Sequence, residues 1–200
     1  MNSFTVGVDE VGRGSLVGSA VICAFRSNNS LFKSLPFSVK DSKKISRNQR
    51  ELIYQYFKKN RNINCSYMII LGKQRDIEKF NIHNVVLHSM SKAVEAVYQK
   101  NDNVIIDGKF IPNNLKKYEA SALVKADDKV EQVSAASIIA KVFRDRILKK
   151  LHKIESVYGW DKNAGYGTKG HILAIYQNGV SKFHRKTYQP ISQLIKKLST

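Results

Sequence analysis

The sequence predicts an α/β fold in which a mixed β-sheet is flanked by α-helices. Two patterns favour this class: segments with strand and helix periodicity alternate along the chain, and an apparent hairpin precedes them. A hairpin makes its two strands antiparallel, whereas strands joined through a helix are usually parallel, so the sheet should contain both orientations. The 200 residues, with 42% hydrophobic content, suffice for one core of ordinary domain size.

The first expected element is a strand near the N-terminus. Apolar residues alternate with polar or small ones over residues 4–9, which is the period of a half-buried strand. The apolar run over residues 17–25 is interpreted as its hairpin partner. Gly12 and Gly14 lie in the connection between them.

A helix is expected to begin after Ser46, because Ser46 and Gln49 have the spacing of a capping box, and to end near Asn60. An apolar strand should follow over residues 65–71. The next helix is indicated by a stripe of apolar residues at helical spacing: Val86, Met90, Ala93, Val94 and Val97.

In the second half, a short buried strand over residues 104–106 ends at Asp107, and residues 122–124 are a candidate for a further strand. Residues 131–153 predict a long helix. Its inward face carries Ile139, Val142, Phe143, Ile147 and Leu151. We expect one domain over residues 1–200, with a helical C-terminal extension from about residue 155.

Apolar runs and cysteines limit the classes of protein that fit. The longest apolar runs fall far short of the roughly 20 residues that a bilayer demands, and no signal-peptide pattern is seen, so we expect a cytoplasmic protein without a membrane partner. Cys23 and Cys65 lie in apolar, strand-like runs without Cys or His neighbours at metal spacing. They are interpreted as buried free thiols rather than as parts of a zinc site.

The charge is strongly one-sided. The chain carries 34 Lys and Arg against 16 Asp and Glu, a formal net charge of +18. Such an excess favours a polyanionic partner, nucleic acid first of all, through phosphate contacts and counterion release. The alternative is an organism whose proteins are basic in general, and the charge alone does not decide between the two.

The few acids of this basic chain stand at informative positions. Asp9, Glu10 and Asp107 lie at the ends of expected strands, and Asp127 lies in a later loop. Strand ends and loops are where scaffolds present catalytic groups, so these carboxylates are candidates to converge. Carboxylates in one place repel each other unless cations bind between them, and hard oxygen ligands favour Mg²⁺ or Mn²⁺. The pattern therefore indicates a metal site.

Each acid also has a simpler interpretation. Asp107 and its following glycine form a common turn dipeptide, and Asp127 with the next acid fits a solvated loop; taken singly, these interpretations are favoured. Asp9 and Glu10 are harder to explain as a turn. Because adjacent strand residues point to opposite faces, we expect the strand to end or bulge there, or Glu10 to contribute its backbone carbonyl.

Residues 7–14, Gly-Val-Asp-Glu-Val-Gly-Arg-Gly, closely resemble the opening signature of the ribonuclease HII family, an acidic pair followed by Gly-Arg-Gly. Further blocks resemble the same family in the same order: residues 40–44, 105–108, 125–127, 134–142, and 165–168 with His171. Together they span nearly the whole chain, and ordered blocks coincide by accident far less readily than one short motif.

The resemblance implies a ribonuclease H-like fold in which Asp9, Glu10, Asp107 and Asp127 hold two divalent ions, Mg²⁺ or Mn²⁺. It implies an endonuclease that hydrolyses the RNA strand of RNA–DNA hybrids and cuts 5′ of single ribonucleotides embedded in duplex DNA, leaving 5′-phosphate and 3′-hydroxyl ends. The implied roles are DNA replication and ribonucleotide excision repair.

The same resemblance points to substrate-binding residues. Gly12, Arg13 and Gly14 would let the backbone approach the ribose and test for its 2′-hydroxyl, and Tyr166 would pack against the next deoxyribose. A plain β-turn and a buried structural tyrosine are the alternatives. Lys43 and Lys141 are candidates for phosphate contacts, against the alternative of solvated lysines. For His171 and His184 a structural role is favoured over a functional one.

Three positions depart from the family pattern. Ser15 and Ser19 stand where the family often has proline, and Ala164 stands where a basic residue is common, which concerns loop rigidity and substrate affinity rather than the carboxylates. Type 3 enzymes generally carry an extra N-terminal domain, whereas the acidic pair here begins at residue 9, so we expect type 2.

Two rivals remain on the sequence alone: a non-catalytic hybrid-binding protein on this scaffold, and a type 3-like enzyme that ignores isolated ribonucleotides. A monomer is expected. Whether a replication clamp binds residues 193–198 is left open.

Overall fold

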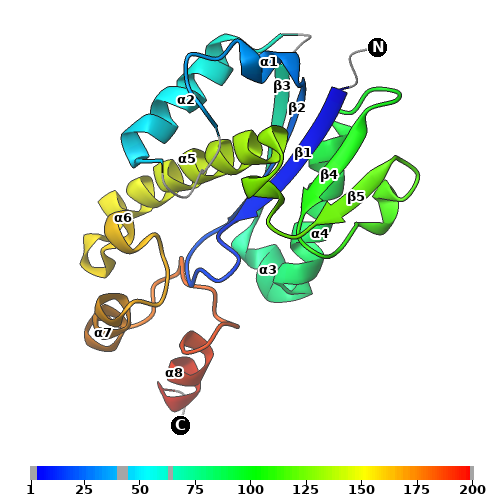
Figure 1. Cartoon of the computed structure of the whole chain (residues 1–200). Coiled ribbons are helices and arrows are strands. Elements are labelled where there is room, and N and C mark those ends of the chain that lie inside the picture. The colour runs from blue at the N-terminus through cyan, green and yellow to red at the C-terminus, as the bar shows by residue number, and fades with distance from the viewer. Residues whose placement is uncertain (1–3, 40–44, 63–64, 199–200) are drawn as a thin grey trace.

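The computed structural model describes residues 4–39, 45–62 and 65–198, and its centre is a five-stranded sheet in the order β3-β2-β1-β4-β5 (Figure 1). The strand bounds are β1 Phe4–Val11, β2 Ala20–Asn28, β3 Cys65–Gly72, β4 Asn103–Asp107 and β5 Ala120–Leu123. β2 is antiparallel to β1 and β3, whereas β4 is parallel to β1 and β5. The mixed sheet expected from the sequence is confirmed.

Helices pack on both faces of this sheet, with α2 and α5 on one face and α4 on the other (Figure 1). The α-helices are α1 Ser30–Lys33, α2 Arg47–Lys59, α3 Gln74–Phe80, α4 Ile82–Glu95, α5 Glu131–Ile154, α6 Trp160–Asn163, α7 Lys169–Asn178 and α8 Ile191–Leu198. Short 3-10 helices are η1 Asn113–Leu115, η2 Ala126–Asp128 and η3 Ser156–Tyr158. Across the ranges described, no helix is both long and apolar enough to cross a membrane.

The start of α2 confirms the capping box predicted from the sequence. The Ser46 side chain accepts a hydrogen bond from the Gln49 amide, and the Gln49 side chain accepts one from the Ser46 amide. These two bonds satisfy backbone donors that the first turn of a helix leaves without partners. The helix ends at Lys59 with Asn60 as its C-cap, as expected.

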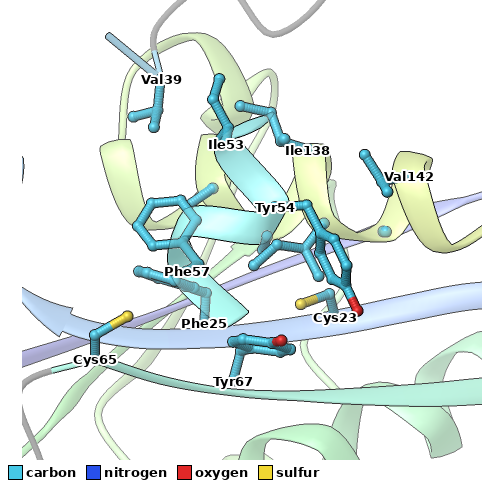
Figure 2. Packing of buried hydrophobic residues seen from close by; sticks show 14 of the residues in the cluster. Cys23, Phe25, Val39, Ile53, Tyr54, Phe57, Cys65, Tyr67, Ile138 and Val142 are labelled. Atoms are coloured by element: carbon cyan, nitrogen blue, oxygen red, sulfur yellow. The ribbon is translucent and has the colours of Figure 1, made fainter. Parts of the chain in front are cut away.

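One hydrophobic cluster lies between the sheet and helices α2 and α5. Figure 2 shows Phe25 of β2 packed against Phe57 of α2, with Ile138 of α5 above them. The Phe25 and Phe57 rings meet edge to face at 4.8 Å between centroids. Cys23 and Cys65 belong to this cluster as buried free thiols, which confirms their expected state.

The alternation of strand residues decides which side of the sheet each position faces. In β1, Val6 and Val8 belong to the cluster under α4, so Gly7 and Asp9 face α5 instead. A Cβ at Gly7 would lie 2.3 Å from the backbone of Gln132 in α5, closer than real atoms approach. The missing side chain therefore lets the main chain of α5 lie directly against β1, beside the position of Asp9.

The hairpin differs from its predicted form at both strands. β1 runs on to Val11 instead of ending at Asp9 and Glu10, and β2 begins at Ala20 rather than at residue 17. Val17 makes an isolated antiparallel bridge with His184, because the C-terminal region packs against the connection between the two strands. The third hydrophobic cluster fills that contact, with Leu16, Val17, Trp160, Ile175 and Ile191 among its buried members.

Candidate active site

An open pocket of about 330 Å³ lies at the end of β1. Its lining includes every site residue predicted from the sequence except Lys43, which is outside the described residues. Within the described ranges, the lining residues are Asp9, Glu10, Val11, Gly12, Arg13, Gly14, Asp107, Lys125, Asp127, Ser137, Lys141 and Tyr166. Residues far apart in the sequence are thus brought to one place, and the four acids share it.

The pocket forms where β1 and β4 stop pairing. The parallel pairing of the two strands ends at Val8 and Ile106, while β1 continues to Val11 paired with β2 alone. Asp9 and Asp107 are the next residues along each strand, so they stand on the two sides of this opening. Loops and ligands commonly occupy such a divergence at the carboxyl ends of parallel strands.

Asp127 reaches the same opening through η2. The backbone amide of Ala126 donates to Oδ1 of Asp107 at 2.8 Å, which ties η2 to the end of β4. Lys125, just before it, has the left-handed backbone conformation with φ of 58°, which is uncommon for a residue with a side chain. Asp127 itself is buried. The placement of Asp127 is therefore built by a tight, specific turn and is not that of a solvated loop.

The expected end or bulge of β1 at Asp9 and Glu10 is wrong. Antiparallel pairing with β2 continues through both residues to Val11 without interruption. The Asp9 side chain instead bonds to the backbone of the next residue: its Oδ1 accepts a hydrogen bond from the Glu10 amide at 2.7 Å. A local bond of this kind redirects a carboxylate without distorting the strand.

Burial dominates the electrostatics of Asp9. Removal from water raises the pKa of the Asp9 carboxyl to about 7, the neighbouring Ser137 hydroxyl counteracts part of this effect, and the charges of Glu10 and Asp107 raise it further. Burial likewise raises the pKa of Glu10, with Arg13 lowering it and Asp107 raising it. Mutual repulsion of this kind is relieved when a cation enters.

The donor set of the pocket fits a divalent cation. The Glu10 Oε1 atom is 3.0 Å from Nε of Arg13, whereas Oε2 is buried and has no hydrogen-bond partner among the described residues. An orphaned carboxylate oxygen beside other buried acids is the chemistry that hard cations such as Mg²⁺ and Mn²⁺ take as ligands. Among the residues described, no three His, Cys, Asp or Glu are close enough to form a ready-made metal centre. The acids therefore share a pocket without forming a closed cage.

The two glycines of the Gly12–Gly14 loop differ in what the fold demands of them. Gly12 has φ of +90°, and a Cβ there would lie 2.6 Å from the guanidinium of buried Arg144. Gly14 is exposed, and of the described residues a Cβ there would meet only Tyr166, at an ordinary 3.9 Å. The fold itself explains Gly12, whereas the missing side chain of Gly14 leaves space on the pocket side.

Three lining residues, Val11, Ser137 and Lys125, were not assigned a role from the sequence. Ser137 lies on α5 and faces Asp9, and Lys125 is exposed at the rim. Ser137 and Lys125 both lie inside sequence blocks that resemble the family, and this position was the feature of the sequence from which a role in the site could have been predicted.

His171 and His184 lie outside the pocket and are buried together in the C-terminal region. The Ser181 amide donates to Nδ1 of His184, so the proton of His184 is on Nε2, which is 3.1 Å from Nε2 of His171. His171 in turn donates from Nδ1 to the Tyr166 carbonyl at 2.9 Å. The pair thus supports the Tyr166 loop, which agrees with the structural role favoured from the sequence.

The mixed sheet, its flanking helices and the acidic pocket at the fork of two parallel strands define a ribonuclease H-like nuclease. The solved structure of a ribonuclease H2 from Pyrococcus horikoshii OT3 superimposes with a TM-score of 0.80 at 26% identity, covering 98% of this chain and 99% of that one. The family model described as Ribonuclease HII matches residues 6–191.

Curated relatives agree with this match. A ribonuclease HII of Pelagibacter ubique is 46% identical over 94% of this chain and 97% of its own length, and one of Hydrogenovibrio crunogenus is 37% identical over 98% and 91%. The chain belongs to the ribonuclease HII family. It is a hydrolase, an endoribonuclease that acts on the RNA strand of RNA–DNA hybrids.

Proposed function

We propose that this enzyme also cuts 5′ of single ribonucleotides embedded in duplex DNA, with two divalent ions held by Asp9, Glu10, Asp107 and Asp127. The observation that carries the proposal is the pocket itself, in which these four acids, the Gly12–Gly14 loop and Tyr166 line one space. A ribose seated against the loop would bring its 5′ phosphate beside the acids.

The loop and Tyr166 supply a means of recognising a ribonucleotide followed by DNA. Gly14 is exposed, and the described part of the chain does not fill the space where its side chain would be, so a ribose has room to approach the backbone. The Tyr166 side chain is 40% exposed and lies beside Gly14, where it offers an apolar face to the next sugar. A deoxyribose, lacking the 2′-hydroxyl, packs there without leaving a polar group unpaired.

The acids are the ligands proposed for the ions. Ions held by these acids would supply activation of the attacking water and stabilisation of the charge on the scissile phosphate and the departing 3′ oxygen, chemistry that would leave 5′-phosphate and 3′-hydroxyl ends. Mg²⁺ and Mn²⁺ both suit four carboxylates. The Ser137 hydroxyl, which lowers the pKa of Asp9, favours the ionised carboxylate that metal binding requires.

Basic residues around the pocket are proposed to hold the phosphates. Lys141 and Lys125 line it, and Arg13 stands beside Glu10 at its edge. The formal net charge of +18 supplies the wider attraction for duplex nucleic acid. We expect Lys43 to belong to the same set. As a whole, the chain is proposed to act as a cytoplasmic, monomeric, single-domain enzyme of DNA replication and ribonucleotide excision repair.

The test is cleavage of duplex DNA that carries one ribonucleotide, with Mg²⁺ or Mn²⁺ and with a chelator. We expect a single cut 5′ of the ribonucleotide in the presence of metal, and none with the chelator. An RNA–DNA hybrid of the same sequence serves as the positive control. Cutting of the hybrid without cutting at the single ribonucleotide would contradict the proposed role of Gly14 and Tyr166.

A further inference from the structure

The Arg13 carbonyl is held by two residues from the far end of the chain. It accepts a hydrogen bond from Nη1 of Arg185 at 2.8 Å and another from the Tyr188 hydroxyl at 2.9 Å. The same Arg185 nitrogen also donates to the Tyr188 oxygen at 3.2 Å, so the three groups form a closed set. Side chains of the C-terminal region thus bind the main chain of the Gly12–Gly14 loop.

Arg185 is completely buried and makes no ion pair with any acid among the described residues. Its Nε donates to the Gly18 carbonyl at 2.9 Å. Burying a cation without a carboxylate is costly, because carbonyl dipoles replace only part of its lost hydration. A buried arginine of this kind is useful because its planar guanidinium holds several N–H donors in fixed directions and can fix the positions of particular carbonyls.

The bond pattern matters because residues 12–15 form a β-turn, closed by the Ser15 amide and the Gly12 carbonyl at 3.4 Å. Its central peptide joins Arg13 to Gly14. Type I and type II turns differ mainly in the direction of that central peptide, and type II requires positive φ at the third residue, where glycine is favoured. Gly14 occupies the third position, yet its φ is not positive.

We propose that Arg185 and Tyr188 are positioning residues for ribonucleotide recognition: by holding the Arg13 carbonyl they select the turn in which the Gly14 amide faces the substrate. In a trans peptide, C=O and N–H point in opposite directions, so the amide points away from Arg185. Gly14 is exposed, lines the pocket, and its amide has no acceptor among the residues described. An oxygen of the 2′-hydroxyl is the acceptor of matching chemistry.

This inference rests on the proposed function, in which the Gly12–Gly14 loop meets the ribose. Without Arg185 and Tyr188, the central peptide would be free to reverse and to present a carbonyl where the amide stood. The enzyme would keep its acids and its duplex-binding charge, and it would lose preference for ribonucleotides over deoxyribonucleotides.

The cleanest test is Tyr188→Phe, which removes a single hydroxyl. Binding to duplex DNA with one ribonucleotide is measured against the same duplex in all-DNA form, in chelator so that nothing is cut. We expect the ratio of the two affinities to fall about tenfold, since roughly one hydrogen bond is lost, with all-DNA binding unchanged. With Mg²⁺, kcat/KM on the single-ribonucleotide duplex should fall by the same factor.

Tyr158→Phe is the matched control. The Tyr158 hydroxyl also donates to a backbone carbonyl, that of Gly179 at 3.0 Å, in the same C-terminal region but away from the Gly12–Gly14 loop. Both variants lose one hydroxyl, so their melting temperatures should fall by similar amounts. A purely structural role for Tyr188 would leave its affinity ratio equal to that of Tyr158→Phe.

Arg185→Lys extends the test because it keeps the charge but loses the fork that reaches both Gly18 and Arg13. We expect a fall in the affinity ratio of about 100-fold, together with a shifted Gly14 amide resonance in an ¹⁵N–¹H spectrum. A wild-type enzyme that binds both duplexes equally would overturn the proposed function itself. A wild-type preference that both Tyr188→Phe and a folded Arg185→Lys retain in full would overturn this inference alone.

Discussion

The two ends of the β1–β2 hairpin treat buried charge in opposite ways. At the end far from the pocket, Arg26 and Asp102 are both buried and form a two-bond pair, with Nε to Oδ2 at 2.6 Å and Nη2 to Oδ1 at 3.1 Å. At the pocket end, Arg144 and Arg185 are equally buried and bind backbone carbonyls without any ion pair in the ranges described.

The difference separates buried charges that stabilise the fold, at the Arg26 end, from buried charges that are placed beside the candidate active site. The Arg26 and Asp102 charges cancel each other, so that end needs no further partner. At the pocket end, burial followed by the nearby Arg185 charge lowers the pKa of Arg144 to about 10, and burial raises that of Asp9 to about 7. Uncancelled charges of both signs are left close to the space where metal and phosphate would bind.

The largest expected effect is a loss of cleavage activity when one of the pocket acids is replaced. If activity were kept, the contrast between the two ends of the hairpin would not hold. Asp107→Asn should lower cleavage of an RNA–DNA hybrid by about 1000-fold or more, because a metal ligand supplies several kcal/mol of transition-state stabilisation. Hybrid binding should be largely retained. Cleavage assays and binding titrations measure the two quantities, and full activity in this variant would remove Asp107 from the ligand set.

Asp102→Asn should do the reverse, with a large effect on stability and little on activity per folded molecule. Breaking a buried pair leaves the Arg26 charge uncompensated, which costs about 3–5 kcal/mol of unfolding free energy. Asp145→Asn is the control, since its ion pairs with Arg47 at 3.0 Å and with Arg50 at 3.8 Å are partly exposed and are together worth about 1 kcal/mol. Urea denaturation compares the variants, and equal losses would show that burial of the Arg26 pair is irrelevant.

The pH dependence sharpens the comparison. Since the pKa of Asp9 rises from 3.8 to about 7 on folding, its favourable contribution is complete below pH 3.8 and is lost as the pH rises through 7, by up to about 4 kcal/mol. In chelator, wild type should therefore lose stability relative to Asp9→Asn between pH 5 and pH 8. Divalent metal at pH 8 should restore the wild type alone. Parallel melting curves for the two proteins would contradict the prediction.

The stability of wild type is compared with that of Asp9→Asn because a second group, His184, changes stability with pH in the opposite direction. Burial, followed by the His171 charge, lowers the pKa of His184 from 6.5 to about 4, so its contribution is lost as the pH falls through 4. Both proteins contain this histidine, and its effect cancels in the comparison.

The regular elements were predictable wherever a local pattern carried the information. The capping box at Ser46 and the apolar stripe of α4 depend on neighbours within a few residues, and both are confirmed. Helix α3 was missed because it is seven residues long and buries Ile77 alone, which leaves no periodic stripe. The start of β2 was misplaced because Val17 pairs with His184, a contact that no local pattern specifies.

The candidate site was predictable where the function of a residue depends on its side-chain type. Acids at strand ends and the ordered family blocks indicated the carboxylates and the Gly12–Gly14 loop, and these residues do line one pocket. The part played by Arg185 could not be seen, since its partners are the carbonyls of Gly18 and Arg13, more than 160 residues away. Every residue has a carbonyl, so such a contact leaves no mark in the sequence.

The direct contact between Gly7 and the main chain of α5 has a consequence for how this family diverges. Asp9 stands on β1 and Ser137 on α5, so the width of the pocket between them is set by two backbones in contact and not by the size of intervening side chains. Aliphatic residues elsewhere in the interior are then exchangeable without moving the reacting groups. A relative at 26% identity that superimposes with a TM-score of 0.80 is what such tolerance produces.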